Sequence, residues 1–97
     1  MATYITLVNY TPKGIETIKD SPRRLDAAKE AFQAYGGELK AFYLVLGRYD
    51  IVIVSEAPDD QAVAKAALAF GARGTVQTET LRAFNEDEYR DIIGAMP

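Results

Sequence analysis

The chain has 97 residues, of which 48% are hydrophobic and 26% are charged, a composition typical of one small folded domain. It contains no cysteine and no histidine, which excludes disulfides, thiol nucleophiles, thiolate or imidazole metal sites and histidine general bases. Eleven basic residues stand against 14 acidic ones, a net charge of −3, so the basic surface that nucleic-acid binding requires is not expected.

No apolar segment approaches the roughly 20 residues of a membrane-spanning helix. The amino terminus lacks the basic and apolar segments of a secretion signal. We therefore expect a cytoplasmic protein of a single domain, residues 1–97, with no membrane or nucleic-acid partner and with no metal or other cofactor.

The first segment with a clear pattern is Thr3–Tyr10, whose β-branched and aromatic residues predict a strand. Thr11 and Pro12 suit the N-cap and the first position of a short helix that stops near Asp20. Ser21-Pro22 then begins a longer helix that ends before two glycines. On one face of that helix we expect Leu25, Ala28, Phe32 and Tyr35.

Two apolar strands, Glu38–Leu46 and Tyr49–Ala57, follow around Gly47-Arg48. A second helix is predicted from Pro58-Asp59-Asp60 to Gly71, with Val63, Ala66, Ala67 and Phe70 facing inward. The last strand is predicted at Thr75–Phe84.

A short terminal helix follows the last strand. Asn85 is the predicted cap, and Glu88 completes a capping box three residues later. Its buried side is expected to hold Tyr89, Ile92, Ile93 and Met96. The order βαββαβ with an added C-terminal helix predicts an α+β fold of the ferredoxin-like type.

The central hairpin has a register that the sequence predicts. A type II′ turn with Gly47 in its first central position pairs Leu46 with Tyr49 and Tyr43 with Val52. One face then carries Leu46, Tyr49, Leu44, Ile51, Phe42 and Ile53, and the other carries Val45, Asp50, Tyr43, Val52, Ala41 and Val54.

Both hairpin faces are therefore apolar at their centre, although two helices can cover only one face of the sheet. The open face needs a cover. A second copy packed sheet against sheet would supply it, giving a dimer or a multiple of dimers. The alternative is that the terminal helix of the same chain folds over this face.

The turn Gly47-Arg48-Tyr49-Asp50 after ELKAFYLVL, with EAPDD and TETLRAF, resembles the GYD-domain family over essentially the whole chain. The resemblance implies a ferredoxin-like, dimeric α/β barrel and implies little about activity. The stretch VLGRYDIVIVSEAPD is also similar to the ligand-sensing domain of Lrp/AsnC-type regulators, without their DNA-binding helix-turn-helix.

Among candidate ligand-binding residues, Asp50 shares a predicted face with Tyr43, where a dimer partner would partly dehydrate it. It could act as a general base or hydrogen-bond donor, or it could accept backbone N–H groups of the turn and fix the hairpin. Tyr49 could stack on an aromatic ligand or pack on Leu46, and Arg48 could bind an anion or lie in solvent.

In the last strand, Thr78, Thr80 and Arg82 share a face, a polar stripe that lines either a cavity or an exposed edge. No nucleophile–base pair and no phosphate-binding glycine loop is present. Two classes of function follow from these patterns. One is a non-catalytic module that binds or senses a small molecule. The other is a cofactor-free enzyme, a monooxygenase or isomerase, which rests on analogy of fold.

Overall fold

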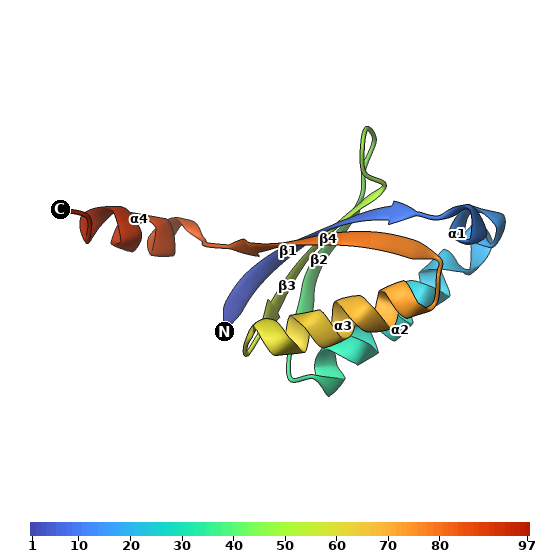
Figure 1. Ribbon diagram of the computed structural model, residues 1–97, viewed down its shortest axis with the longest axis horizontal. Helices are drawn as coiled ribbons and strands as arrows, with labels where there is room; N and C mark the ends of the chain where they lie inside the picture. The colour runs from blue at the N-terminus through green and yellow to red at the C-terminus, as the bar shows by residue number, and fades with distance from the viewer.

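The computed structural model describes residues 1–97. The elements are β1 (Ala2–Tyr10), α1 (Pro12–Glu16), the 3₁₀ turn η1 (Ile18–Asp20), α2 (Ser21–Ala34), β2 (Glu38–Leu44), β3 (Ile51–Ala57), α3 (Asp60–Ala72), β4 (Val76–Ala83) and α4 (Glu86–Gly94). The four strands form one antiparallel sheet in the order β2-β3-β1-β4. Helices α2 and α3 lie along one face of this sheet, and α4 projects beyond the end of β4 (Figure 1). The predicted α+β, ferredoxin-like architecture with a C-terminal helix is confirmed.

Helices α1 and α3 begin at side-chain caps, whereas α2 begins after Asp20 without one. The Thr11 side chain accepts a hydrogen bond from the Gly14 N–H at 3.2 Å, ahead of Pro12 in the first turn of α1. The Asp59 carboxylate accepts one from the Ala62 N–H at 2.9 Å and caps α3. These side chains satisfy amide groups that a helix N-terminus otherwise leaves unpaired.

Helix α1 packs directly on the segment that leads into β4. The Thr11 N–H donates to the Thr75 carbonyl at 3.0 Å, and a β-carbon at position 14 would lie only 2.1 Å from that same carbonyl oxygen. Only glycine permits so close an approach. The contact fixes one end of the molecule, where α1, α2 and the start of β4 meet.

The core lies between the sheet and the two long helices. Alternate residues of β1 and β3 are buried on this face, as expected for central strands of a half-covered sheet. Phe32 of α2 and Phe70 of α3 pack with ring centroids 5.8 Å apart and join the helices above it. The buried apolar residues are Tyr4, Val8, Ala28, Phe32, Ile51, Ile53, Ala57, Ala62, Val63 and Ala66.

The central hairpin has the predicted register: Ala41, Phe42, Tyr43 and Leu44 pair with Val54, Ile53, Val52 and Ile51. Its strands are shorter than predicted, because regular pairing stops at Leu44 and resumes at Ile51. Residues 45–50 leave the plane of the sheet as a longer loop (Figure 1), and Leu46 is 98% exposed. Leu44 pairs with Ile51 and so shares its face as predicted, although Leu44 is 72% exposed. The predicted place of Leu46 on that face is wrong, because Leu46 lies in the loop beyond the end of β2.

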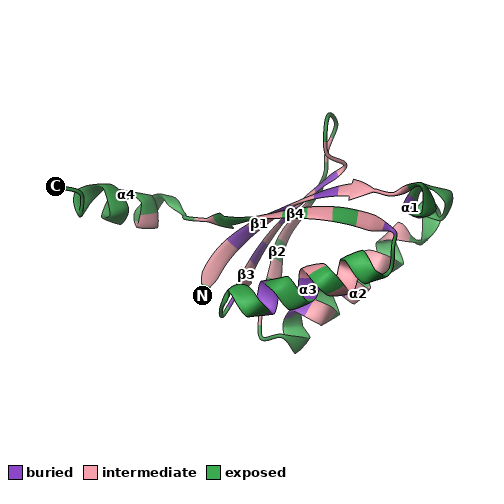
Figure 2. Ribbon diagram, in the orientation of Figure 1, coloured by how far each residue is buried: buried purple, intermediate pink, exposed green.

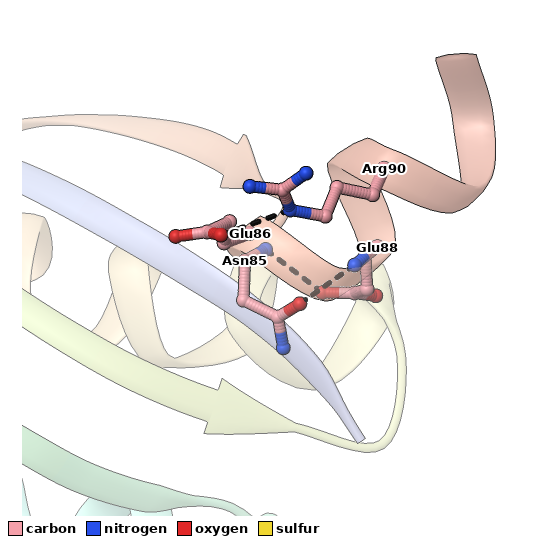
Figure 3. A network of polar contacts seen from close by, with 4 residues as sticks. All are labelled: Asn85, Glu86, Glu88 and Arg90. Carbon is pink, nitrogen blue, oxygen red and sulfur yellow. Dashed lines mark hydrogen bonds and ion pairs between the residues drawn. The ribbon is translucent and has the colours of Figure 1, made fainter. Parts of the chain in front are cut away.

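Helix α4 begins as predicted, with both hydrogen bonds of the Asn85–Glu88 capping box present (Figure 3). The prediction of a buried side is wrong. Tyr89, Ile92, Ile93 and Met96 are 58%, 45%, 50% and 62% exposed, and the helix does not fold over the sheet (Figure 2). Helical spacing identifies the apolar side of a helix, but it does not identify the surface against which that side packs.

Candidate binding surfaces

The face of the sheet opposite α2 and α3 has no cover within the chain. We call it the open sheet face. The strand register places on it the apolar residues Ile5, Leu7, Ala41, Tyr43, Val52, Val54, Leu81 and Ala83. Tyr43 is 58% exposed and Leu81 44%, and the others are partly exposed. A contiguous apolar face of this kind on all four strands is typical of an interaction surface.

Asp50 joins the hairpin to β1. Its carboxylate accepts a hydrogen bond from the Tyr10 N–H at 2.9 Å, and its own N–H donates to the Val8 carbonyl at 2.9 Å. Its carbonyl accepts from the Val45 N–H at 2.8 Å. The sequence left two roles open for Asp50, a reactive carboxylate or one that fixes the hairpin. The geometry agrees with the second role. The amide that the carboxylate accepts from belongs to β1, however, and not to the turn.

Tyr49 crosses from the hairpin toward β4. Its hydroxyl donates to the Glu79 carboxylate at 2.7 Å, and the Arg48 guanidinium lies 6.0 Å from its ring centroid. The hydrogen bond to Glu79 raises the pKa of Tyr49. Glu79 pairs with Leu7 and so lies on the open sheet face. The predicted position of Tyr49 on the face of Ile51 is therefore wrong, because regular alternation ends before residue 49.

Thr78, Thr80 and Arg82 do share a face of β4, since they pair with Val8, Thr6 and Tyr4 of the helix-covered face. Arg82 lies across two aromatic rings, 5.7 Å from the ring centroid of Tyr4 and 4.5 Å from that of Phe84. The six candidate residues are consequently not gathered in one site. Tyr43 lies on the open sheet face, whereas Thr78 and Arg82 lie on the other side of the sheet.

Below Arg82, the Tyr4 hydroxyl donates a hydrogen bond to the Asp60 carboxylate at the start of α3. Burial, together with this hydrogen bond, raises the pKa of Tyr4 to about 12. Tyr4 is only 3% exposed, so the pair ties β1 to α3 under the sheet. We assign it to the fold and not to a site.

Helix α4 is the second uncovered surface. Tyr89, Ile92 and Ile93 lie at positions i, i+3 and i+4 and form one side of the helix, and Met96 follows at i+7, just beyond the helix end at Gly94. The opposite side is charged, and the Arg90 Nε lies 2.9 Å from the Glu86 carboxylate (Figure 3). Helix α4 therefore has the form of an amphipathic segment whose apolar side lacks a partner.

Sequence reasoning missed a hollow under α2 and α3, at the end of the molecule where α1 packs. Arg24, Leu25 and Ala28 face it from α2, and Phe42 and Thr78 line it from the sheet. A signal was present: Arg24 falls next to Leu25 and one turn before Ala28, which puts a cation on the side of the helix that faces the core. No cluster of three or more potential metal ligands is present, and none of the helices combines the length and apolar character needed to cross a bilayer.

Taken together, these features define a small ferredoxin-like domain with an uncovered sheet face and a projecting amphipathic helix. The model of the GYD domain family matches residues 4–93, and the chain belongs to that family. A relative from Thermus thermophilus, named as a glutamine synthetase and cystathionine beta-lyase binding protein, is 42% identical over 84 residues. The match covers 86% of this chain and 88% of the relative.

Among solved structures, the fold is similar to two Mycobacterium tuberculosis regulators. One is a feast or famine regulatory protein complexed with L-methionine, with a TM-score of 0.66 and 15% identity over 88% of this chain. The other is a leucine response regulatory protein, with a TM-score of 0.64 and 16% identity over 87% of this chain. This chain spans 51% of the length of each. The similarity confirms the predicted likeness in fold to regulators of this type.

Proposed function

We propose that the chain is a non-catalytic binding module that docks onto an enzyme through the apolar side of α4. The observation that carries this proposal is the exposed apolar stripe of Tyr89, Ile92 and Ile93 on a helix that projects from the body of the protein, with exposed Met96 just beyond the helix end. Helices that bind in a groove on another protein use anchors at this i, i+3, i+4, i+7 spacing.

A helix of nine residues is marginal in water without tertiary contacts. The capping box and the Glu86–Arg90 pair favour helix formation at the amino end of α4, but no packed surface supports its apolar side. Docking into a groove would bury that side and stabilise the helix. Such a partner explains why an exposed terminal segment carries both a complete cap and a continuous apolar stripe.

The relative at 42% identity supports an enzyme as the partner, because it is named for binding glutamine synthetase and cystathionine beta-lyase. For this chain we propose the same class of partner, an enzyme that handles amino acids. Glutamine synthetase from the protein's own source is the first to test.

The test measures binding of the purified protein to purified glutamine synthetase by titration calorimetry. Ile93→Ser shortens one anchor and should weaken binding by tenfold or more, which corresponds to about 1.4 kcal/mol. Asp91→Ser, on the charged side of the same helix, is the matched control and should bind like the wild type. If both variants bind equally well, α4 is not the docking element. If the wild type binds neither this enzyme nor cystathionine beta-lyase, the proposed partner class is wrong.

We also propose that the protein is a homodimer, or a multiple of dimers, that buries the open sheet face of each copy. The support is the apolar character of that face across all four strands. Two sheets packed in this way form the two-fold, self-complementary interface that is commonest among homo-oligomers. A small molecule is the second candidate ligand, and the hollow under α2 and α3 favours it.

A further inference from the structure

The hollow under α2 and α3 has an apolar floor and polar groups toward its edge. The floor belongs to a core cluster around Val8, Ile51 and Ile53, with Phe42 packed against it. Leu25, Ala28 and Phe70 of the two helices close it from the other side. The hollow is open to solvent on one side. Small-molecule sites are typically concave and mostly apolar, with a few polar groups that orient the ligand.

Two arginines, Arg24 and Arg73, supply the charge of this hollow, and neither forms an ion pair with a carboxylate. The Arg24 guanidinium is held in place by the Thr17 carbonyl at 3.1 Å and the Gly14 carbonyl at 3.3 Å. The Arg73 side chain is exposed at the end of α3. The two cations beside an apolar interior favour an anionic group attached to an apolar body.

The edge of the hollow is held in place by the rest of the fold. The Arg73 carbonyl accepts a hydrogen bond from the Lys13 ammonium at 3.2 Å, and the Thr11 N–H donates to the Thr75 carbonyl at 3.0 Å. Tyr10 and Ser21 share a hydroxyl hydrogen bond at 2.9 Å. A site already in position loses less free energy on binding than one that must be ordered by its ligand.

The lining also limits the class of ligand. None of its 14 residues is an aspartate or a glutamate. An α-amino acid brought into the hollow would therefore find hydroxyl acceptors but no carboxylate to neutralise its ammonium group, which costs free energy in a partly dehydrated place. A simple carboxylic acid carries no such group.

We propose that this hollow binds a carboxylic acid with an apolar chain or ring, the chain lying against Phe42 and Ile51 and the carboxylate meeting Arg24 and Arg73. The site is separate from α4 and from the open sheet face. It therefore stands whether or not the enzyme partner proposed above is correct.

The probe is octanoate, with octanamide as its neutral counterpart and L-methionine as an apolar amino acid. Calorimetric titration should show octanoate binding at least tenfold more tightly than either of the other two, about 1.4 kcal/mol. Octanoate should also raise the melting temperature, because it binds the native state. Amide chemical shifts should change around Phe42, Ile51 and Phe70.

Three variants locate the site. Arg73→Gln should weaken octanoate binding about tenfold, as expected when one charge-assisted contact is lost. Arg23→Gln is the matched control, since Arg23 is an exposed neighbour on α2 that does not line the hollow, and it should bind like the wild type. Ala28→Leu fills the hollow and should abolish binding while the protein remains folded.

Four results would overturn the proposal. These are no octanoate binding at millimolar concentration, equal binding of octanamide, tighter binding of L-methionine, and undiminished binding by Ala28→Leu. If Ala28→Leu does not fold, Phe42→Ala is used in its place. Unchanged octanoate affinity in Phe42→Ala would also overturn the proposal. The glutamine synthetase titration is a separate experiment, and its failure would bear on α4 alone.

Discussion

Tyr4 is the residue whose ionisation is most strongly coupled to folding. Its pKa rises from 10.0 to about 12 because its side chain is buried and donates a hydrogen bond to Asp60. The folded protein therefore holds the phenolic proton more tightly than the unfolded chain does. The stabilisation is complete below pH 10 and is lost as the pH rises from 10 toward 12, and a two-unit shift corresponds to roughly 2–3 kcal/mol.

Tyr4→Phe should remove this dependence. The difference in unfolding free energy between the wild type and Tyr4→Phe, measured by urea titration, should be about 1 kcal/mol at neutral pH. It should fall through zero and change sign between pH 10 and pH 12, because the wild type loses the roughly 2–3 kcal/mol coupled to the Tyr4 proton and the variant does not. Tyr35→Phe, at a tyrosine that is 38% exposed, is the control and should keep the wild-type slope. A constant difference across that range would show that the Tyr4 proton is not coupled to folding.

The role of Asp50 depends on a contact that its sequence neighbours do not predict. Its spacing after Gly47 suggested either a catalytic carboxylate or a turn-fixing one. The hydrogen bond from the Tyr10 N–H comes from a strand 40 residues earlier in the chain. No pattern around the hairpin could indicate that partner, because the contact depends on how β1 pairs with β3.

At the scale of elements, the β2–β3 hairpin depends on Gly47. This residue has a φ of +111°, and a β-carbon there would meet nothing within 4 Å. Any loss of stability when Gly47 is replaced therefore comes from backbone strain and not from a steric clash of the new side chain. Gly47→Val should cost roughly 1–3 kcal/mol, whereas Arg48→Val at an exposed neighbouring position should stay within about 0.5 kcal/mol.

The two hairpin variants are compared by denaturant titration. Equal costs would mean that the loop relaxes into another conformation and that the turn assignment is incorrect. Because the loop leaves the sheet plane, its exposed Leu46 should tolerate Leu46→Ser without loss of stability in the isolated chain.

At the scale of the whole molecule, the main feature is the open sheet face, whose apolar side chains are not packed against any other part of the chain. Val52→Asp places a charge at its centre and should give a monomer, or an unfolded protein, where light scattering finds a dimer for the wild type. Tyr43→Asp is the second variant, since Tyr43 is 58% exposed and its replacement should spare the fold of the single chain.

Gln77→Asp is the matched control for these two variants, because Gln77 is exposed on the edge strand β4 and outside the apolar centre of the face. It should remain dimeric. A wild-type protein that is monomeric at micromolar concentration, or dimeric Tyr43→Asp, would contradict the proposed interface.

Much of the local structure follows from the sequence alone. Thr11 and Asn85 cap helices as predicted, and Tyr43 pairs with Val52 in the predicted register. These features depend on neighbours along the chain, so a pattern of a few residues contains the whole interaction. The order of elements then leaves few ways to arrange four strands and two long helices, which explains why the ferredoxin-like fold was predictable.

Only the tertiary structure decided the features that join distant segments. Helix α4 has a predictable apolar side, yet its position away from the sheet depends on the direction in which β4 ends. Tyr49 meets Glu79, 30 residues away in the sequence, only in the folded sheet. The hollow that Arg24 and Arg73 line exists because α2, α3 and the sheet, from distant parts of the chain, meet around it. The sequence determined each element and its polarity, and the packing of elements far apart in the chain determined which surfaces remain open for binding.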